Sequence, residues 1–373
     1  MKQAMKINRV ILLLLLTCAS HLVDAATLPG IPEFIDEMVA KHQFDRAELE
    51  RAFDHAQILP NVIEAISRPA TIRPWPEYRA SFVNPERIKL GLIFWKKYRT
   101  ALQRAEQKYG VPQEIILAVI GVETVYGRDA GTFRTLDALT TLAFDYPQRA
   151  GFFRSELENY LLLAREQQFD LLAVRGSYAG ALGIPQFMPS SYRTYGVDSS
   201  GDHRVDLLHE TRDAIGSVAN YLKNYGWVGA ANKKVAHDKR AGSAPPVAVP
   251  VKVSEDICIG DILTPRPVAA WLEAGIAPGV NLAHVQDEPS RLIDFTVDGG
   301  KEFWLVFKNF DVITRYNNSD YYAMSVFQLA EAVKAARQSG AAKKSRSTNK
   351  PITANKPSTE NKSSMENKLS AAR

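Results

Sequence analysis

Cysteine is scarce in this 373-residue chain, which contains two such residues, Cys18 and Cys258. Cys18 lies in an N-terminal stretch that has the composition of an export signal. Cleavage of that stretch would leave Cys258 alone, and a single cysteine cannot form an intrachain disulfide. We therefore expect no disulfide framework, and the apolar core must hold the fold together.

Long apolar runs are absent after the N-terminal segment, so we expect no transmembrane helix there. Near the N-terminus, Lys2, Lys6 and Arg9 precede the run VILLLLL, and a polar stretch follows that ends in Val-Asp-Ala at Ala25. A basic region, a short apolar core and a small residue before the cleavage point are typical of a secretory signal peptide. We predict that residues 1–25 are such a peptide.

Lipid attachment at Cys18 is the alternative use of this segment. A lipoprotein cleavage site prefers a small residue at the position that Thr17 occupies. We therefore expect export without a lipid anchor.

The charge balance is basic, with a net charge of +5 and an isoelectric point of about 9.0. Nucleic acid is not an expected partner of an exported protein, whereas an anionic envelope polymer or membrane surface is. Much of the basic excess lies in residues 339–373, which are rich in Lys, Ser, Asn and Thr and lack aromatic side chains. This composition predicts a disordered basic tail.

The remaining pattern predicts a mainly α fold with a small β-rich insert, an α+β protein. Residues 26–108 have helical periodicity interrupted by a proline-rich strip, and residues 109–240 contain the densest helical pattern. Residues 241–308 are predicted to form a small β-rich domain. Residues 309–338 form a final segment that ends in a helix.

Two local predictions concern proline and β-branched residues. The strip RPATIRPWPEYRASFVNPER contains Pro69, Pro74, Pro76 and Pro85, and we predict that it is extended. The short runs PVAVPVKV, FTVDG, EFWLVFKN and DVITRYN predict strands, because they are β-branched or aromatic and are separated by Gly and Pro.

One carboxylate stands out, in the segment IGVETVYG at residues 120–127. Glu123 follows the apolar run PQEIILAV on a helix that Pro112 is expected to open. A buried, unpaired carboxylate is costly, and burial raises its pKa toward the value that a general acid needs. The alternative is that Glu123 points to water at a helix end.

Two further segments carry side chains suited to a sugar ligand. In SYAGALGIPQFMPSSY, the glycines allow close backbone approach, and Gln186 and Phe187 offer an amide and an apolar face. In NFDVITRYNNSDYYAMSV, Tyr316, Tyr321 and Tyr322 lie beside Asn317. Tyrosine rings cover pyranose faces while their hydroxyls stay polar. An ordinary connecting loop and core packing are the respective alternatives.

The segment DSSGDHRVDL resembles the start of a calcium loop, with alternating oxygens at Asp198, Ser200 and Asp202. Its glycine comes early, and a histidine stands where the closing glutamate is usual. Glu210 or Asp213 could close a longer loop. A solvated acidic turn is the alternative.

Four motifs, IGVETVYG, GALGIPQFMPSSY, DAIGSVANYL and ITRYNNSDYYAMSV, follow one another in this order. Over residues 30–338 the chain closely resembles the lytic murein transglycosylase B family of exported bacterial enzymes. The resemblance implies a lysozyme-like helical core, residues 109–240, flanked by a helical domain and a β domain. It also implies a periplasmic enzyme that cleaves the β-1,4 bond between N-acetylmuramic acid and N-acetylglucosamine in peptidoglycan and forms 1,6-anhydromuramic acid.

The resemblance also implies partners. Glycan strands of peptidoglycan are the substrate, proteins of cell-wall synthesis or hydrolysis are candidate partners, and the chain is expected to be a monomer. Catalysis needs no cofactor in this family.

Site residues carry over by motif. The family's single catalytic acid matches Glu123. Its substrate-binding positions match Tyr78, Arg149, Ser177, Gln186, Phe187, Tyr221, Tyr316, Asn317 and Tyr322. Its structural calcium loop matches Asp198, Ser200, Asp202, the backbone carbonyl of Arg204, and Asp213. The loop here is one residue longer before DAIGS, which bears on the closing ligand.

A single acid sets the expected mechanism apart from that of common glycosidases, which use two carboxylates. Asp129 and Asp145 lie nearby in the sequence but lack the apolar setting of Glu123. Glu123 would act first as acid and then as base, while the sugar's own O6 hydroxyl attacks. Two other interpretations stay open: a hydrolase that uses water and a second carboxylate, and a non-enzymatic peptidoglycan-binding scaffold.

Overall fold

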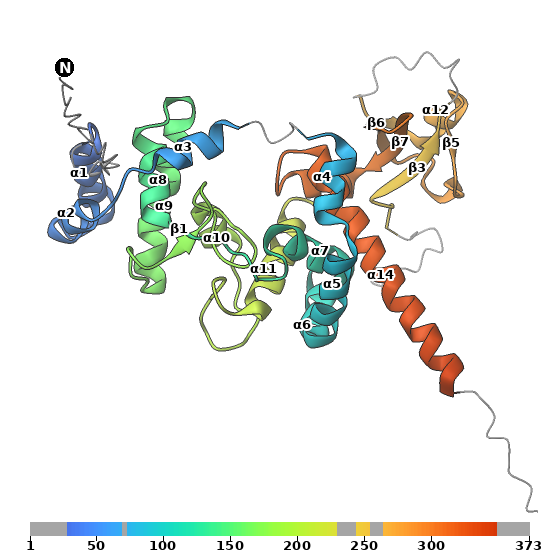
Figure 1. Cartoon of the computed structure of the whole chain (residues 1–373), viewed down its shortest axis with the longest axis horizontal. Helices are drawn as coiled ribbons and strands as arrows, with labels where there is room; N and C mark the ends of the chain where they lie inside the picture. Colours follow the sequence, from blue (N-terminus) through green and yellow to red (C-terminus); the bar gives the residue numbers. More distant parts are fainter. Residues whose placement is uncertain (1–27, 69–72, 230–243, 254–263, 349–373) are drawn as a thin grey trace, which may run out of the picture.

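The computed structural model describes residues 28–68, 73–229, 244–253 and 264–348 (Figure 1). The predicted signal peptide, Cys18, Cys258 and the end of the predicted tail lie outside these ranges. The described chain is mainly helical and elongated, with its first two helices, α1 Ile31–His42 and α2 Arg46–Asp54, at one end and the sheet near the other (Figure 1). None of its helices combines the length and the apolar character needed to cross a bilayer.

Within the described residues, six helices precede α7 Gln113–Thr124, the helix that carries Glu123. They are α1 Ile31–His42, α2 Arg46–Asp54, α3 Pro60–Ser67, α4 Trp75–Phe82, α5 Pro85–Lys97 and α6 Arg99–Tyr109. Local chemistry starts several of them. Asp45 accepts a hydrogen bond from the backbone N–H of Glu48 at 2.8 Å, and Asn84 accepts one from Arg87 at 2.9 Å. Both are N-caps that satisfy helix-terminal donors.

The predicted extended strip is helical over Trp75–Phe82 and from Pro85 onward, so that prediction was wrong there. Pro76 is in the first turn of α4, and Pro85 is the first residue of α5. Proline is tolerated there because the first turn needs no N–H donor. The prolines mark helix starts. The Trp75 indole N–H donates to Glu302 at 2.7 Å, which fastens α4 to the sheet.

The central region contains the helices that the periodicity predicts. They are α7 Gln113–Thr124, α8 Thr135–Phe144, α9 Ala150–Gln167, α10 Pro189–Tyr195 and α11 Thr211–Asn224, with a 3-10 turn η2 at Pro147–Arg149. Two short strands, β1 Phe133–Arg134 and β2 Arg175–Gly176, pair antiparallel. Helix α7 is buried from Ile115 to Val122 and packs against α5, α6, α11 and the C-terminal helix α14, Asp320–Thr348.

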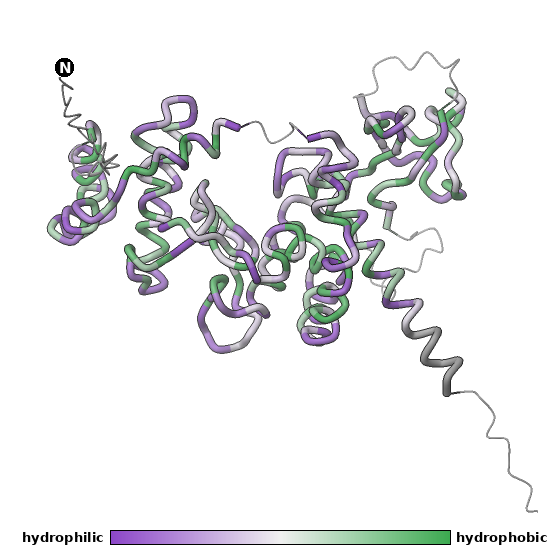
Figure 2. Tube along the Cα trace, viewed as in Figure 1, coloured by the Kyte–Doolittle hydropathy of each residue, from purple (hydrophilic) through white to green (hydrophobic). Residues whose placement is uncertain are grey.

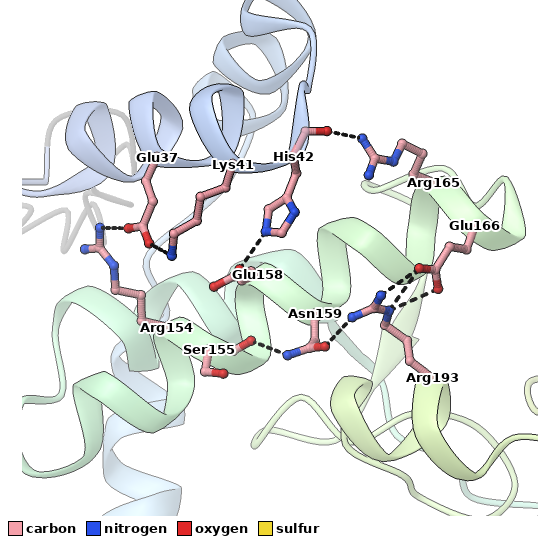
Figure 3. Close-up of polar contacts among 10 residues, drawn as sticks. All are labelled: Glu37, Lys41, His42, Arg154, Ser155, Glu158, Asn159, Arg165, Glu166 and Arg193. Atoms are coloured by element: carbon pink, nitrogen blue, oxygen red, sulfur yellow. Dashed lines mark hydrogen bonds and ion pairs between the residues drawn. The ribbon is translucent and has the colours of Figure 1, made fainter.

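Helix α1 lies beside α9, and polar contacts join the two (Figure 3). Glu37 pairs with Arg154 at 3.0 Å, and His42 contacts Glu158 at 2.6 Å. Such partly exposed pairs contribute little to stability, so the apolar face of α1 provides the main attachment. Figure 2 shows hydrophobic and hydrophilic residues alternating along these helices, as amphipathic packing requires.

The β-rich insert is a five-stranded antiparallel sheet with strand order β4-β6-β7-β3-β5. The strands are β3 Ala248–Lys252, β4 Arg266–Pro267, β5 Ala277–Pro278, β6 Pro289–Val297 and β7 Gly300–Phe307, with α12 Val268–Glu273 and the turn η3 Ala283–Val285 between them. Trp271, Leu292 and Leu305 belong to an apolar cluster separate from the main core. The insert therefore has a core of its own.

The final helices correct two predictions. The run DVITRYN lies mostly in helix α13, Lys308–Thr314, and is not a strand. Phe310, Val312 and Ile313 are buried there, so packing overrides their local β preference. Helix α14 spans Asp320–Thr348. The predicted disorder of residues 339–373 was therefore wrong up to Thr348.

Candidate active site

Glu123 lies in the last turn of α7, between the buried residues Val122 and Thr124. Its side chain keeps some solvent-accessible surface, but protein atoms surround it closely. The Tyr322 hydroxyl donates a hydrogen bond to Glu123 Oε1 at 2.5 Å. Burial raises the pKa of Glu123 to about 7, and the bond from Tyr322 opposes this rise as the smaller effect. Near neutral pH the carboxyl can therefore both give and take a proton.

Tyr316 and Tyr322 come from the connection between α13 and α14 and from the first turn of α14. Their rings stack with centroids 6.3 Å apart and planes 12° apart. The Tyr316 hydroxyl donates to the carbonyl of Pro185. Burial, and then the charge of Glu123, raise the pKa of both phenols well above their ordinary value. Both tyrosines are thus neutral donors beside the carboxyl.

Phe187 and Tyr221 pack against the ring of Tyr316. The three rings lie 4.8 to 5.7 Å apart between centroids. Phe187 and Tyr221 are 2% and 6% exposed, so they can offer little surface to a ligand. The Tyr221 hydroxyl also donates to the Arg315 carbonyl at 2.5 Å. The geometry gives these two residues a packing role beneath the site.

Gln186 belongs to the loop after β2 and has a left-handed backbone, with φ of 51°. Its amide nitrogen donates to the carbonyls of Ala130 and Gly183 at 3.0 and 2.8 Å. The side-chain oxygen is then the atom left for a ligand. Ser177 opens the same loop, and its hydroxyl accepts bonds from the N–H groups of Ala179 and Ala181. Ser177 therefore shapes the loop backbone.

Tyr78 reaches the site from α4. Its ring contacts Phe82 and Tyr321 at 5.1 and 5.5 Å between centroids. Burial, and then the charge of Glu123, raise the pKa of Tyr78, so the phenol lies within electrostatic range of the carboxyl. Tyr321, which the sequence places in the tyrosine cluster, packs on Trp75 and Phe295. It is partly buried and packs against the core.

Two of the expected binding residues lie apart from this group. Arg149 is exposed at the end of η2, with its guanidinium 4.4 Å from the centroid of the Phe152 ring. Asn317 is also exposed and follows Tyr316 directly. Among the described residues, no polar contact joins either side chain to Glu123. Both would contact a ligand only at the margin of the site.

Sequence reasoning missed three residues around the end of α7. The Thr124 hydroxyl donates to the Ile184 carbonyl at 2.8 Å and accepts from the Gly127 N–H at 2.9 Å. It ties the helix to the Gln186 loop. Arg87 donates to the carbonyl of Gly121, and Tyr126 packs beside that glycine. Thr124 and Tyr126 could have been found from the sequence, because they lie in the ETVYG motif. No sequence signal points to Arg87.

The candidate calcium loop brings three carboxylates together. Oxygens of Asp198, Asp202 and Asp213 lie within 4.8 Å of one another. Carboxylate oxygens are the ligands that calcium prefers. Asp213 is buried and accepts backbone N–H bonds from Ser199 and Ser200, and burial raises the pKa of its carboxyl. A cation in the loop would offset the cost of that buried charge, so the residues fit calcium.

Asp213, and not Glu210, has its carboxylate beside those of Asp198 and Asp202. Glu210 is the N-cap of α11 and accepts from the N–H of Arg212 at 2.9 Å. Ser200 lies inside the loop, and its hydroxyl donates to Asp198 at 3.1 Å. Arg204 follows Asp202, which accepts the Arg204 N–H at 3.0 Å and holds this backbone in place.

The sequence matches the transglycosylase SLT domain family over residues 28–331. The chain belongs to this family. It is 42% identical over 324 residues to the membrane-bound lytic murein transglycosylase B of Escherichia coli strain K12, covering 84% of this chain and 85% of that protein. This transglycosylase is accordingly a lytic enzyme with the expected α+β fold.

Solved structures agree with the assignment. The Escherichia coli lytic transglycosylase Slt35, solved in complex with calcium, has a TM-score of 0.75 at 42% identity and covers 84% of this chain and 95% of that one. The Pseudomonas aeruginosa protein SltB3, in complex with NAG-anhNAM-pentapeptide, has a TM-score of 0.71 at 28% identity, with coverages of 82% and 78%. The fold predicted from the motifs is thereby confirmed.

The two aspartates that lie near Glu123 in the sequence do not accompany it in the site. Asp129 and Asp145 are both exposed, and no described contact joins either to Glu123. A cavity of about 540 Å³ lies elsewhere, with Trp227, Asn309 and Phe327 in its wall. None of the expected site residues lines that cavity, so it is separate from the candidate active site.

Proposed function

We propose that this transglycosylase cleaves the β-1,4 bond between N-acetylmuramic acid and N-acetylglucosamine in peptidoglycan and leaves a 1,6-anhydromuramic acid end. Glu123 is the catalytic residue, first as acid and then as base. The observation that carries the proposal is the setting of Glu123, whose buried carboxyl has a pKa of about 7 and accepts a hydrogen bond from Tyr322. The bond cleaved and the product follow the family resemblance.

The reaction requires a single protein group. Protonated Glu123 gives its proton to the departing glycosidic oxygen, and the C1–O4 bond breaks. The acetamide of the muramic acid stabilises the positive charge at C1. The Glu123 carboxylate then takes the proton of the O6 hydroxyl as O6 bonds to C1. No water is consumed, and intramolecular attack has a high effective molarity.

The tyrosines would position the sugar and the acid. Tyr322 holds one carboxyl oxygen, which leaves the other oxygen to face the glycosidic bond. Tyr316 and Tyr78 offer ring faces next to the carboxyl, a suitable surface for pyranose rings. Gln186 and Asn317 would bind acetamide or hydroxyl groups, and Arg149 would meet the substrate farther out. A relative in this family is solved with bulgecin A and another with NAG-NAM-pentapeptide.

Calcium, when bound, would supply positive charge that neutralises the loop carboxylates and stabilises the fold. Asp198, Asp202 and Asp213 would hold it, together with Ser200 and the carbonyl of Arg204. The loop plays no part in proton transfer in this proposal, because none of its residues contacts Glu123 in the described structure. Catalysis itself uses the side chains of the chain alone.

We further propose that the chain is exported to the periplasm by residues 1–25 and works there as a monomer, with cell-wall proteins as candidate partners. The Escherichia coli relative is named as membrane-bound. Intact-mass analysis of protein from the producing cell decides the question of an anchor. Cleavage after Ala25 supports free export, and a lipid-modified Cys18 at the N-terminus refutes it.

Mass spectrometry of fragments released from purified sacculi tests the proposed reaction, with Glu123→Gln as the matched control. We expect fragments that end in anhydromuramic acid, lighter by one water than hydrolysis products, from the wild type alone. Reducing ends would identify a hydrolase with a second carboxylate. Binding to sacculi without release by a folded wild type would identify a scaffold.

A further inference from the structure

The backbone after Glu123 takes an unusual course. Val125, Tyr126 and Gly127 have successive positive φ angles of 50°, 64° and 84°. Glycine adopts this conformation freely, but a β-branched valine and a tyrosine do so at a cost of about 1 kcal/mol or more each. Such a turn persists only where surrounding contacts over-determine it. Here the turn sends the Tyr126 side chain back beneath α7.

Tyr126 fills the space between α5 and α7. A Cβ atom built at Gly91, inside α5, would lie 2.5 Å from the Tyr126 hydroxyl, and one at Gly121, inside α7, would lie 2.7 Å from its Cζ. Glycine within a helix costs about 1 kcal/mol relative to alanine. Two interior glycines on different helices thus make room for the same phenol. The Tyr126 ring also packs on Phe94, 5.4 Å between centroids.

The Tyr126 hydroxyl is buried and has no hydrogen-bond partner among the described residues. The side chain is therefore held by shape rather than by a polar contact. Gly121 and Glu123 are two positions apart on α7, about 200° around the helix axis. Tyr126 consequently supports α7 from the face opposite the carboxyl.

Arg87 acts on the same turn from α5. Its guanidinium donates to the carbonyl of Gly121 and lies 3.4 Å from the carbonyl of Val122. The last carbonyls of a helix have no partner within the helix, so this cation satisfies acceptors directly before Glu123. Tyr126 and Arg87 together fix the end of α7 to α5.

We propose that Tyr126 is a positioning residue, a wedge that works with the Arg87 clamp to keep the Glu123 carboxyl enclosed beside Tyr322. The wedge acts through the volume of its ring, and neither residue touches the reacting atoms. This inference rests on the proposed function for its kinetic consequence. Its structural consequence, the enclosure of Glu123, can be measured without turnover.

The first experiment compares Tyr126→Leu and Tyr126→Phe with Phe34→Leu. Phe34 is a fully buried ring in α1, remote from the site, so its variant controls for a general loss of packing. In Tyr126→Leu we expect kcat to fall about ten- to a hundredfold because Glu123 is misplaced, with KM changed little. Tyr126→Phe keeps the ring and loses no hydrogen bond, so it should retain most of the wild-type activity. If Tyr126→Phe is as inactive as Tyr126→Leu, the proposed wedge role is wrong.

The carboxyl of Glu123 is followed directly by ¹³C NMR titration, with Glu123→Gln used to assign its signal. A loosened turn admits water to the carboxyl, so its midpoint should shift to lower pH in Tyr126→Leu, but not in Phe34→Leu. An unchanged midpoint in Tyr126→Leu overturns this inference alone. If the wild-type carboxyl is enclosed but the protein releases no fragments from sacculi, the proposed function is wrong. The positioning role of Tyr126 is then unaffected.

A double-mutant cycle tests the contact itself. Gly91→Ala alone should reduce kcat, because the new methyl group would collide with the Tyr126 hydroxyl and, at 2.8 Å, with Val333. In a Tyr126→Phe background the hydroxyl is gone and the nearest Tyr126 atom is Cζ, at 3.2 Å. The Gly91→Ala effect should then shrink. Equal effects in both backgrounds would show that the contact does not transmit to Glu123.

Discussion

Tyr322 donates its hydroxyl hydrogen to Glu123 across 2.5 Å, although 199 residues separate the two in the sequence. The bond joins the start of α14 to the end of α7, so the C-terminal helix helps to complete the site. It has two consequences for the carboxyl. It favours the ionised form slightly, against the larger effect of burial, and it fixes one of the two oxygens.

The rate of glycan cleavage should fall as pH rises through about 7. The first step needs protonated Glu123, and burial places its pKa at about 7. The protonated fraction is therefore large below this pH and falls above it. A profile of kcat/KM against pH reports this group in the free enzyme. An alkaline limb near pH 4.5, the ordinary value for a glutamate, would contradict the enclosed acid.

Tyr322→Phe should move this limb to higher pH. The substitution removes the hydrogen bond that lowers the pKa of Glu123 and leaves the burial that raises it. Tyr321→Phe is the matched control, because Tyr321 is the adjacent residue and packs against the core. A limb that moves equally in both variants, or only in the control, would show that Tyr322 does not set the acidity.

Glu123→Gln should stabilise the protein above pH 7 and have little effect at pH 5. The pKa of Glu123 is higher in the folded than in the unfolded chain, so folding binds a proton between about pH 4.5 and 7. Wild-type stability therefore falls as pH rises through this window, by about 3 kcal/mol. Urea unfolding of both proteins at pH 5 and pH 8.5 measures the difference between their free energies of unfolding. A difference that does not change with pH would argue against a buried charge.

The setting of Glu123 was predictable because its cause is local. An uninterrupted apolar run must be buried, and one carboxylate at its end must then be enclosed. The tyrosine cluster and the grouping of loop carboxylates were predictable for a similar reason, since adjacent rings and alternating oxygens are visible in a short stretch of sequence. The family resemblance added the expectation that these segments, which are far apart in the sequence, lie together in one site. No short stretch of sequence contains that information.

Other features depend on contacts that a window does not contain. Proline favours both extended strips and helix starts, and only the neighbouring structure decides that Pro76 and Pro85 begin helices. DVITRYN has strand propensity, yet burial of its Val312 and Ile313 against the core accompanies a helix, α13. Likewise, the start of α11 determines that Asp213, and not Glu210, lies beside Asp198 and Asp202. The Tyr126 wedge depends on φ angles and on packing against a different helix.

Asn317→Ala should weaken glycan binding without destabilising the fold. The side chain is exposed, so the free energy of unfolding should change by less than about 0.5 kcal/mol. Loss of one hydrogen bond to a sugar should raise Kd about three- to tenfold. Calorimetry with peptidoglycan fragments in the Glu123→Gln background measures this change. The exposed neighbour Asn318→Ala is the control, and an equal effect from both would deny Asn317 a specific contact.

Tyr316→Ala should weaken glycan binding and also destabilise the fold. Tyr316→Ala deletes a ring that stacks on Tyr322 and rests on Phe187 and Tyr221, so it should cost about 3 kcal/mol of stability or more as well as binding. Tyr316→Phe keeps the ring and separates the two effects. Wild-type activity in a folded Tyr316→Ala/Asn317→Ala double variant would mean that this cluster only packs the core.

Chelation should lower the melting temperature if calcium occupies the loop. A ligand present at about 100 times its Kd stabilises the folded state by about 2.7 kcal/mol, and its removal should lower the melting temperature by about 5–10 °C. Asp202→Asn should abolish this response, because it removes a ligand charge while an amide oxygen can still accept the Arg204 N–H. Asp213→Ala is a poorer test, since that carboxylate also holds the backbone of Ser199, Ser200 and Asp206. Asp206→Asn, outside the ligand set, should keep the chelator response. An unchanged melting temperature, together with no calcium by elemental analysis, would leave the three carboxylates as a hydrogen-bonded turn without a metal.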